Sequence, residues 1–322
     1  MKMTDAPAGT ATTTNVPLTD APTAKQTHHL CVCICTYKRP ELLKRLLTTL
    51  TNQHTEGLFS YSIVVADNDS AQSARPIVQA FSSQMPLPVT YCSEPRQNIA
   101  LARNKALENT DGDFVVFIDD DEFPAATWLW HLFKPCLADG IHGVLGPVNP
   151  WFEHDAPQWV RKGGFFDRPN HPAGYKLTWA ECRTGNVLFK KSILEGIDIP
   201  FRPEFATAGE DMDFFRRMID KGCTFIWCRD AAVYEVVPLA RCNRSFLLKR
   251  ALLRGSNFPK HPTDRLKNVL KSILAVPAYT LGLPLFAAFG QHVFFRYLVK
   301  LCDHTSRLLA FAGWSVVKER ET

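Results

Sequence analysis

The chain has 322 residues, of which 46% are hydrophobic and 21% charged, and its formal net charge is +5. These fractions are ordinary for a globular protein, and the length suffices for one large domain or two small ones. The mild positive charge suits an anionic small substrate or a membrane surface. It is too small to indicate nucleic acid as a partner.

The N-terminal segment has no features of a secretory signal. Residues 1–28 are rich in Thr, Ala and Pro, and lack both a basic start and an apolar run. They are predicted to form a disordered leader. The ten cysteines include no CxxC pair, so reduced cysteines buried in the core are expected. Both observations place the bulk of the protein in the cytosol.

Apolar runs alternate with helical patterns in the first third of the chain. Strands are predicted at residues 30–35, 61–66, 88–92 and 114–118, with helices after Pro40 and from Asn98 to Glu108. This alternation predicts a parallel, doubly wound α/β sheet. The absence of a Gly-x-Gly-x-x-Gly or Walker-type loop argues against a dinucleotide dehydrogenase or a P-loop enzyme.

Three adjacent carboxylates, Asp119, Asp120 and Asp121, follow the fourth predicted strand. In open α/β sheets, ligands bind at the carboxyl ends of the strands. Three neighbouring negative charges are costly unless a cation or several hydrogen-bond donors offset them. Hard cations such as Mg²⁺ and Mn²⁺ take oxygen ligands and bridge phosphates. The sequence therefore predicts a site for a metal and a diphosphate.

The second half of the chain begins with an irregular, aromatic-rich segment at residues 144–183. Two roles for its aromatic rings are equally compatible with the pattern: lining a groove that binds an acceptor molecule, or packing against the sheet. Further strands are predicted at 184–189, 224–228 and 232–237. Helices are predicted from Gly209 to Met218 and from Ser245 to Arg254.

The composition changes in the C-terminal region. Residues 272–290 carry no charge, contain two prolines, and are flanked by basic residues. A hairpin or in-plane helix resting on anionic lipid is the favoured interpretation, and ordinary packed helices are the alternative. Residues 29–258 are taken as the catalytic domain and residues 259–322 as amphipathic or hydrophobic helices that associate with a membrane.

Six short motifs follow one another along the chain. They are Cys35-Thr-Tyr-Lys-Arg-Pro40, Asp67-Asn-Asp-Ser70, Ala102-Arg-Asn104, Ile118-Asp-Asp-Asp121, Arg183-Thr-Gly-Asn186 and Gly209-Glu-Asp-Met-Asp213. This is the order found in family-2 glycosyltransferases of the GT-A fold, which this chain resembles over about residues 30–255. The tail at residues 234–255 resembles the bacterial exopolysaccharide, succinoglycan-type branch.

The resemblance implies a mixed GT-A sheet flanked by helices, and inverting transfer of a sugar from a nucleotide-diphosphate donor. Asp119 and Asp121 would be the metal ligands, for Mg²⁺ or Mn²⁺, and Asp119 and Asp120 would also contact the donor. A frame shifted to Asp120 and Glu122 is the alternative. The cation would offset charge on the leaving diphosphate.

The resemblance assigns the general base to Asp211, with Glu210 supporting it or binding the acceptor. A base must lie within hydrogen-bond reach of the acceptor hydroxyl. Both acids stand at a predicted helix N-terminus, where the helix dipole favours ionised carboxylates. Simple helix capping is the alternative role for both residues.

Other residues are assigned to the donor by the same resemblance. Asp67 and Asn68 would contact the nucleobase or ribose, and an Asp-Asn pair leaves UDP- and dTDP-sugars open. The remaining assignments are Thr36, Tyr37, Arg39, Arg103 and Asn186. Packing, a turn or a surface charge could equally explain Tyr37, Asn186 and Arg103.

The predicted function is sugar transfer to a glycan or a polyprenyl-diphosphate-linked acceptor at the cytoplasmic face of the inner membrane, in exopolysaccharide or capsule synthesis. The alternatives are a sugar-nucleotide nucleotidyltransferase and an inactive, glycan-binding GT-A protein. Other members of the resembled family place a His near this position as an extra metal ligand. This chain has Glu235 there, so whether a third protein ligand exists is left open. Arg241, Arg250 and Arg254 suit either a diphosphate or anionic lipid.

Overall fold

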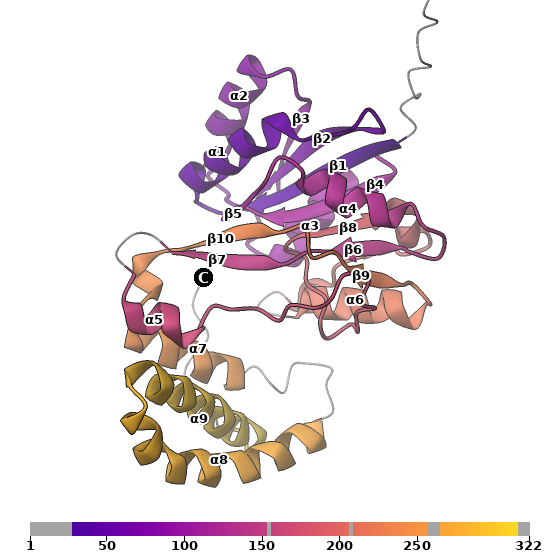
Figure 1. Cartoon of the computed structure of the whole chain (residues 1–322). Helices are drawn as coiled ribbons and strands as arrows, with labels where there is room; N and C mark the ends of the chain where they lie inside the picture. The colour runs from indigo at the N-terminus through magenta and orange to yellow at the C-terminus, as the bar shows by residue number, and fades with distance from the viewer. Residues whose placement is uncertain (1–27, 153–155, 206–208, 257–264, 315–322) are drawn as a thin grey trace, which may run out of the picture.

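The computed structural model describes residues 28–152, 156–205, 209–256 and 265–314 (Figure 1). The leader predicted at residues 1–28 lies outside this part except for its last residue. The fold has two sheets, a set of helices on both faces of the larger sheet, and a helical unit at the C-terminal end.

The larger sheet has seven strands in the order β3-β2-β1-β4-β8-β6-β9. The strands β1 to β4 pair in parallel, as the sequence predicts, whereas β8 runs antiparallel to both β4 and β6. The sheet is therefore mixed. Its strands are β1 (His28–Thr36), β2 (Phe59–Asp67), β3 (Val89–Ser93), β4 (Phe114–Asp119), β6 (Gly143–Leu145), β8 (Val187–Lys190) and β9 (Phe225–Trp227).

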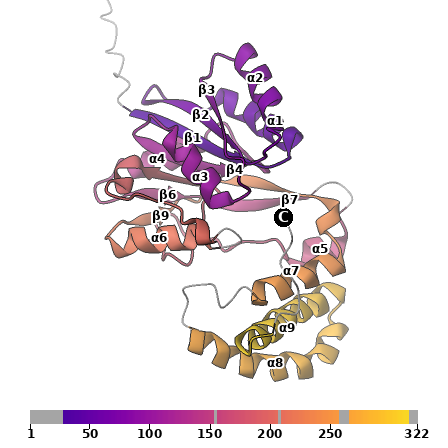
Figure 2. The same ribbon diagram turned by 180° about the vertical axis from the view of Figure 1, so that it is seen from behind.

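Helices cover both faces of this sheet. In β1, Val32 faces the core beneath one set of helices and Cys33 faces the opposite core, because successive side chains on a strand alternate. One face is covered by α1 (Pro40–Thr49), α2 (Arg75–Gln84) and α4 (Trp128–Cys136). The other is covered by α3 (Ile99–Glu108) and α6 (Glu210–Asp220), seen from behind in Figure 2.

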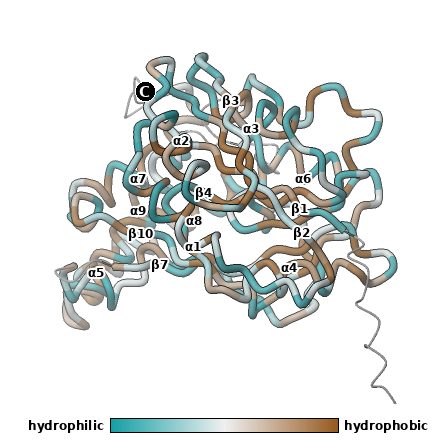
Figure 3. The backbone as a smooth tube through the Cα atoms, turned by 90° about the horizontal axis from the view of Figure 1, so that it is seen from above, coloured by the Kyte–Doolittle hydropathy of each residue, from teal (hydrophilic) through white to brown (hydrophobic). Residues whose placement is uncertain are grey.

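Burial on both faces explains the continuous apolar runs of the central strands. In β1 and β4, Leu30 to Ile34 and Phe114 to Ile118 are at most 4% exposed. Figure 3 shows stretches of hydrophobic residues in the central strands. All ten cysteines are free, and Cys31 and Cys33 are buried in the sheet. This agrees with their interpretation as reduced core residues.

A second sheet of three strands has the order β5-β10-β7. Its strands are β5 (Glu122–Pro124), β7 (Val148–Phe152) and β10 (Val233–Val237). The antiparallel pairing of β10 with β5 sets Glu235 opposite Glu122. The backbone N–H of Val236 donates to the carbonyl oxygen of Asp121 at 2.9 Å. The second sheet thus continues directly from the acidic end of β4.

The C-terminal helices form one unit with α5 (Gln158–Gly163) and α7 (Arg244–Ser256). The helix α8 (Arg265–Ala288) forms a hairpin with α9 (Gln291–Phe311), and α9 packs on α7 and α5. Trp159 contacts Phe295, with ring centroids 5.1 Å apart. Ser272 on α8 hydrogen-bonds to His304 on α9 at 2.9 Å. Short 3₁₀ turns are η1 (Leu50–Asn52), η2 (Lys191–Leu194), η3 (Pro203–Phe205) and η4 (Leu239–Arg241).

Candidate functional site

A cavity of about 460 Å³ lies at the carboxyl ends of β1, β2 and β4. The register explains why polar side chains meet there: Cys35 of β1 pairs with Asp119 of β4, and Thr36 pairs with Asp67 of β2. Eight of the residues assigned to donor or metal line this cavity. They are Thr36, Tyr37, Arg39, Asn68, Arg103, Asp119, Asp120 and Asp121.

The middle carboxylate of the acidic run, Asp120, holds the loop after β1. It is 5% exposed, accepts from Thr36 Oγ1 at 2.7 Å, and accepts from Arg39 Nη1 at 2.9 Å. Burial raises the pKa of Asp120, and Arg39 offsets part of that rise. With its two oxygens engaged by this loop, Asp120 is a poorer choice as a metal ligand than its two neighbours. This favours the Asp119–Asp121 frame over the shifted one.

The neighbouring acids form a cluster with an excess of negative charge. Burial, followed by the nearby Asp119 carboxylate, raises the pKa of Asp121 to about 6, although Arg39 Nη1 lies 3.1 Å from its Oδ2. Burial and Asp119 also raise the pKa of Glu122 well above its usual value. Within the part of the chain that the structure describes, the buried Oε1 of Glu122 has no hydrogen-bond partner. A cation would offset these charges.

The carboxylates at the end of β4 supply the oxygen ligands that a divalent cation prefers. Within the described ranges, no three His, Cys, Asp or Glu side chains converge as a ready-made ligand set. Mg²⁺ usually binds to one or two carboxylates and completes its shell with water and substrate phosphate oxygens. Asp119 and Asp121, beside the unpartnered Glu122 oxygen, suit that mode of binding. The residues present therefore fit the cation that the fold implies.

Arg103 on α3 links the cavity to the start of α6. It lines the cavity and donates through Nη1 to Oε1 of Glu210, both side chains being buried. Asp119 and Asp211 both act electrostatically on this guanidinium. Burial raises the pKa of Glu210, and Arg103 counters the effect. Arg103 therefore links the acids predicted to bind the metal with the acids predicted to supply the base.

Asp211 differs from Glu210 in its accessibility. It is partly exposed, whereas Glu210 is buried. Its Oδ1 accepts from the N–H of Met212 at 2.8 Å, in the first turn of α6. A carboxylate that is reachable by solvent and stands at a helix N-terminus suits a base better than one already paired with Arg103.

Two of the residues assigned to the donor use their side chains inside the fold. Asp67 is fully buried and accepts from the N–H groups of Asp69 and Ala74 and from the hydroxyl of Tyr91. Neither Asp67 nor Asn186 is among the residues that line the cavity.

Asn186 is also fully buried and links three segments of the fold. It accepts from Trp128 Nε1 at 2.7 Å and donates to the carbonyl oxygens of Pro147 and Ala231. Its backbone φ of 59° lies in the left-handed region, which Asn tolerates. Asn186 therefore occupies a turn, which is the alternative role that the sequence offered for it.

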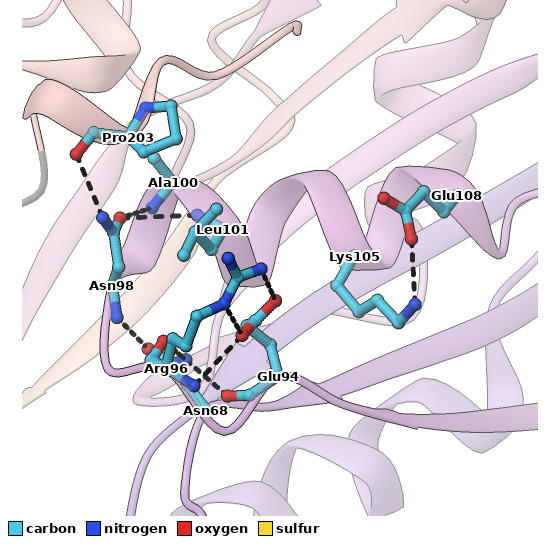
Figure 4. Close-up of polar contacts among 9 residues, drawn as sticks. All are labelled: Asn68, Glu94, Arg96, Asn98, Ala100, Leu101, Lys105, Glu108 and Pro203. Carbon is cyan, nitrogen blue, oxygen red and sulfur yellow. Dashed lines mark hydrogen bonds and ion pairs between the residues drawn. The ribbon is translucent and has the colours of Figure 1, made fainter.

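Asn68 lines the cavity but directs its amide into the loop that follows β3 (Figure 4). Its Nδ2 donates to the carbonyl oxygens of Glu94 and Arg96, both at 2.8 Å, and its Oδ1 accepts from the N–H of Asn98. Asn98 in turn caps α3 and donates to the carbonyl oxygen of Pro203 at 3.0 Å. Asn68 therefore shapes the wall of the cavity.

Gln97, Glu235 and Arg241 also line the cavity. The sequence left Glu235 open as a metal ligand and Arg241 open as a contact for a diphosphate or lipid, and it did not single out Gln97. Gln97 is an exposed amide beside Asn98, and no local pattern distinguishes it from a loop residue. Arg168 lies in the irregular aromatic segment and donates through Nη2 to Oε2 of Glu235, which lines the cavity. Arg241 Nη1 lies 3.6 Å from Oε1 of Glu235. Only the folded chain brings these groups to the acidic cluster.

Comparisons with known proteins agree with this architecture. The profile described as Glycosyl transferase family 2 matches residues 31–197. The succinoglycan biosynthesis protein ExoM of Rhizobium meliloti (strain 1021) is 35% identical over 236 residues, which cover 71% of this chain and 74% of that protein.

Two solved structures share the fold. The mannosyltransferase PcManGT from Pyrobaculum calidifontis, in complex with GDP-Man and Mn²⁺, has a TM-score of 0.61 at 18% identity and covers 91% of this chain and 88% of its own. S. aureus TarS 1–349, in complex with UDP, has a TM-score of 0.51 at 16% identity and covers 90% of this chain and 94% of its own. The family match, the identity to ExoM and the mixed GT-A-type sheet confirm the resemblance: this chain belongs to glycosyl transferase family 2.

Proposed function

We propose that this protein transfers a sugar, with inversion, from a nucleotide-diphosphate donor to a glycan or lipid-linked acceptor in the synthesis of an extracellular polysaccharide. The observation that carries the proposal is the cavity in which Arg39, Asp119 and Asp121 meet, with Arg103 joining it to the acids of α6. The identity to a succinoglycan biosynthesis protein supports the polysaccharide class of product.

The donor would lie along the carboxyl ends of β1, β2 and β4. Tyr37 and the loop walls held by Asn68 would bound the nucleoside, and Arg39 would face the diphosphate. Because the polar atoms of Asp67 and Asn68 are engaged within the fold, other groups such as the exposed Gln97 would contact the base. A UDP- or dTDP-sugar remains the proposed donor, and the fold neighbour in complex with UDP supports the nucleotide class.

Asp119 and Asp121 would hold Mg²⁺ or Mn²⁺. The bound cation would neutralise charge on the leaving diphosphate. The fold neighbour in complex with GDP-Man and Mn²⁺ supports this assignment. Asp120 would keep Arg39 and Thr36 in place, so that the loop after β1 stays beside the two ligands.

Asp211 would act as the general base. It would remove the proton from the acceptor hydroxyl while the hydroxyl oxygen forms a bond to the anomeric carbon. The bond from that carbon to the diphosphate oxygen breaks on the opposite face, and the electron pair leaves with the diphosphate. Glu210, held by Arg103, would set the position of Asp211 at the start of α6.

The hairpin of α8 and α9 would rest on the membrane. Residues 266–288 form a helix long and apolar enough to cross a bilayer, and only 11% of its most apolar window is buried. Leu274 and Leu281 are 73% and 82% exposed. With basic residues flanking it, this helix suits the surface of an anionic, cytoplasmic leaflet. We assign residues 29–258 to catalysis and 259–322 to membrane association.

A screen of nucleotide-sugars with Mn²⁺ or Mg²⁺ tests the proposal. Release of nucleotide diphosphate should require a divalent cation and should stop when EDTA is added. If the protein binds the nucleotide but releases no nucleotide diphosphate with any sugar or acceptor, it is an inactive, glycan-binding relative instead. Release of inorganic pyrophosphate from a sugar phosphate and a nucleoside triphosphate would identify a nucleotidyltransferase.

A further inference from the structure

A second cavity, of about 510 Å³, lies on the other side of the acidic cluster. It is bounded by the aromatic-rich segment before β8, by the end of β6 and by α7. Four of its lining residues are arginines, namely Arg168, Arg183, Arg250 and Arg254, against two acids, Asp167 and Glu181.

Among the residues that the structure describes, two of these arginines form ion pairs and two do not. Arg168 is paired with Glu235, and Arg254 Nε donates to Asp303 Oδ1 at 2.8 Å. Arg183 donates to the carbonyl oxygens of Ala180 and Cys182. Arg250 makes no ion pair within the described residues, and its guanidinium lies 5.4 Å from the centre of the Phe166 ring.

The surroundings of Arg250 favour an added anion. Partial burial and then the charge of Arg254 lower the pKa of Arg250; Glu235 opposes this shift, whereas Arg168 and Arg241 add to it. Repulsion among these cations is relieved when an anion binds between them. Planar guanidinium groups match the oxygens of a phosphate in pairs, so phosphate is the anion that this lining suits best.

The two cavities share a wall. Gly185 lines the second cavity, and a Cβ placed there would lie 3.0 Å from Oδ2 of Asp119 and 2.8 Å from Oε1 of Glu122. Arg168, which lines the second cavity, binds Glu235, which lines the first. A molecule held in the second cavity therefore lies directly beside the acids assigned to the donor.

The second cavity also lies toward the C-terminal helices. Arg250 and Arg254 project from α7, which stands between the sheets and the α8–α9 hairpin in Figure 1. The helices α7 and α9 are joined by the ion pair between Arg254 and Asp303 and by the hydrogen bond between Ser256 and Ser306. The exposed apolar face of α8 is on the same helical unit. On a path from this helical unit to the acidic cluster, a lipid-borne group would reach α7 first.

We propose that this second cavity binds the phosphate groups of a lipid-linked acceptor, with Arg250 and Arg183 as the recognising side chains; the proposal rests on the proposed function. The donor diphosphate would lie in the first cavity beside Arg39 and Arg103, which are paired with Asp120 and Glu210. Anchoring the carrier phosphate at Arg250 would fix the acceptor glycan against the shared wall at Gly185, within reach of the donor.

Binding of farnesyl diphosphate to detergent-solubilised, full-length protein tests the proposal, with UDP and Mn²⁺ measured in parallel. Arg250→Gln should weaken farnesyl diphosphate binding about tenfold or more, because it removes a charged hydrogen-bond donor to the phosphate. The affinity for UDP should not change. Arg250→Lys should recover only part of the loss, because lysine keeps the charge without the fork. Lys249→Gln, an exposed charge on the same helix, is the matched control.

The other outcomes identify other ligands. An equal loss of UDP affinity in Arg250→Gln would assign the cavity to the donor. Loss of binding to phosphatidylglycerol vesicles with unchanged farnesyl diphosphate affinity would assign Arg250 to lipid headgroups. Equal farnesyl diphosphate affinity in all variants would overturn the proposal. An Arg250-dependent diphosphate site in a protein that turns over no nucleotide-sugar would reject the proposed function alone.

Discussion

The guanidinium of Arg103 donates to the carboxylate of Glu210, which is 107 positions further along the chain. This contact ties α3, beside the cavity, to the first turn of α6, where Asp211 stands. It sets the distance between the acids assigned to the cation and the acid assigned as base. The pair is buried, so each charge depends on the other.

Removing one partner of this pair should destabilise the fold. Arg103→Met leaves the Glu210 carboxylate buried without its cation, and a loss of about 3–5 kcal/mol in the free energy of unfolding is expected. Urea denaturation measures it. The double variant Arg103→Met, Glu210→Gln should recover a large part of the loss. If the two changes instead add, the contact contributes little.

The acid cluster should cost stability when no cation is bound. Asp121 has a pKa of about 6 in the folded protein, against about 4 when unfolded. The folded state therefore holds a proton that the unfolded state releases, and stability should fall as pH rises from about 4 to 6. At pH 7, Asp121→Asn should raise the free energy of unfolding by about 1–3 kcal/mol.

Thermal unfolding with EDTA at pH 4 and pH 7 checks this. The gain from Asp121→Asn should disappear at the lower pH, and the variant should also lose its stabilisation by UDP with Mn²⁺. Asp139→Asn, at an exposed carboxylate outside the cavity, is the control and should show neither effect. A gain that does not depend on pH would contradict the electrostatic explanation.

Replacing the proposed base should separate chemistry from donor binding. Asp211→Asn should lower kcat by about 10²–10⁴-fold, because the acceptor hydroxyl then lacks a proton acceptor. The KM for the donor should stay near that of the wild type. Initial rates with a varied nucleotide-sugar give both constants. Nearly normal turnover would assign the base to another carboxylate.

Asn186 should matter for stability more than for the donor. Asn186→Ala removes the acceptor of Trp128 Nε1 and the donors to two buried carbonyl oxygens. A loss of about 2–4 kcal/mol in the free energy of unfolding is expected. The donor KM of the folded variant should be little changed. If the variant kept wild-type stability but showed a large rise in the KM for the donor, Asn186 would be assigned to donor binding instead.

Charges on the outer face of α8 should release the protein from membranes. Leu274 and Leu281 are largely exposed, so replacing both with Glu should leave the fold intact while removing apolar contact with lipid. Co-sedimentation with anionic vesicles should fall sharply, whereas Lys249→Gln should weaken it only slightly. Undiminished sedimentation of the double variant would refute the lipid contact.

The sequence by itself determined the parts that depend on local pattern. Periodicity gave the strands β1 to β4 and the helices α1, α3 and α6, because burial on one or two faces leaves a regular trace in the order of residues. The position of the acidic run directly after Ile118 placed the cavity at the carboxyl edge of the sheet. Motif order indicated the family.

Only the tertiary structure decided which polar groups are available. Asp67 and Asn186 have the residue types of a binding site, yet their side chains are used inside the fold: Asp67 accepts from nearby backbone N–H groups, and Asn186 bonds to groups far away in the sequence. The antiparallel direction of β8, the pairing of Arg103 with Glu210 and the second, arginine-lined cavity likewise join segments that are far apart in sequence. Hydrogen bonds and ion pairs of this kind depend on which segments meet in three dimensions, and a local pattern carries no record of that meeting.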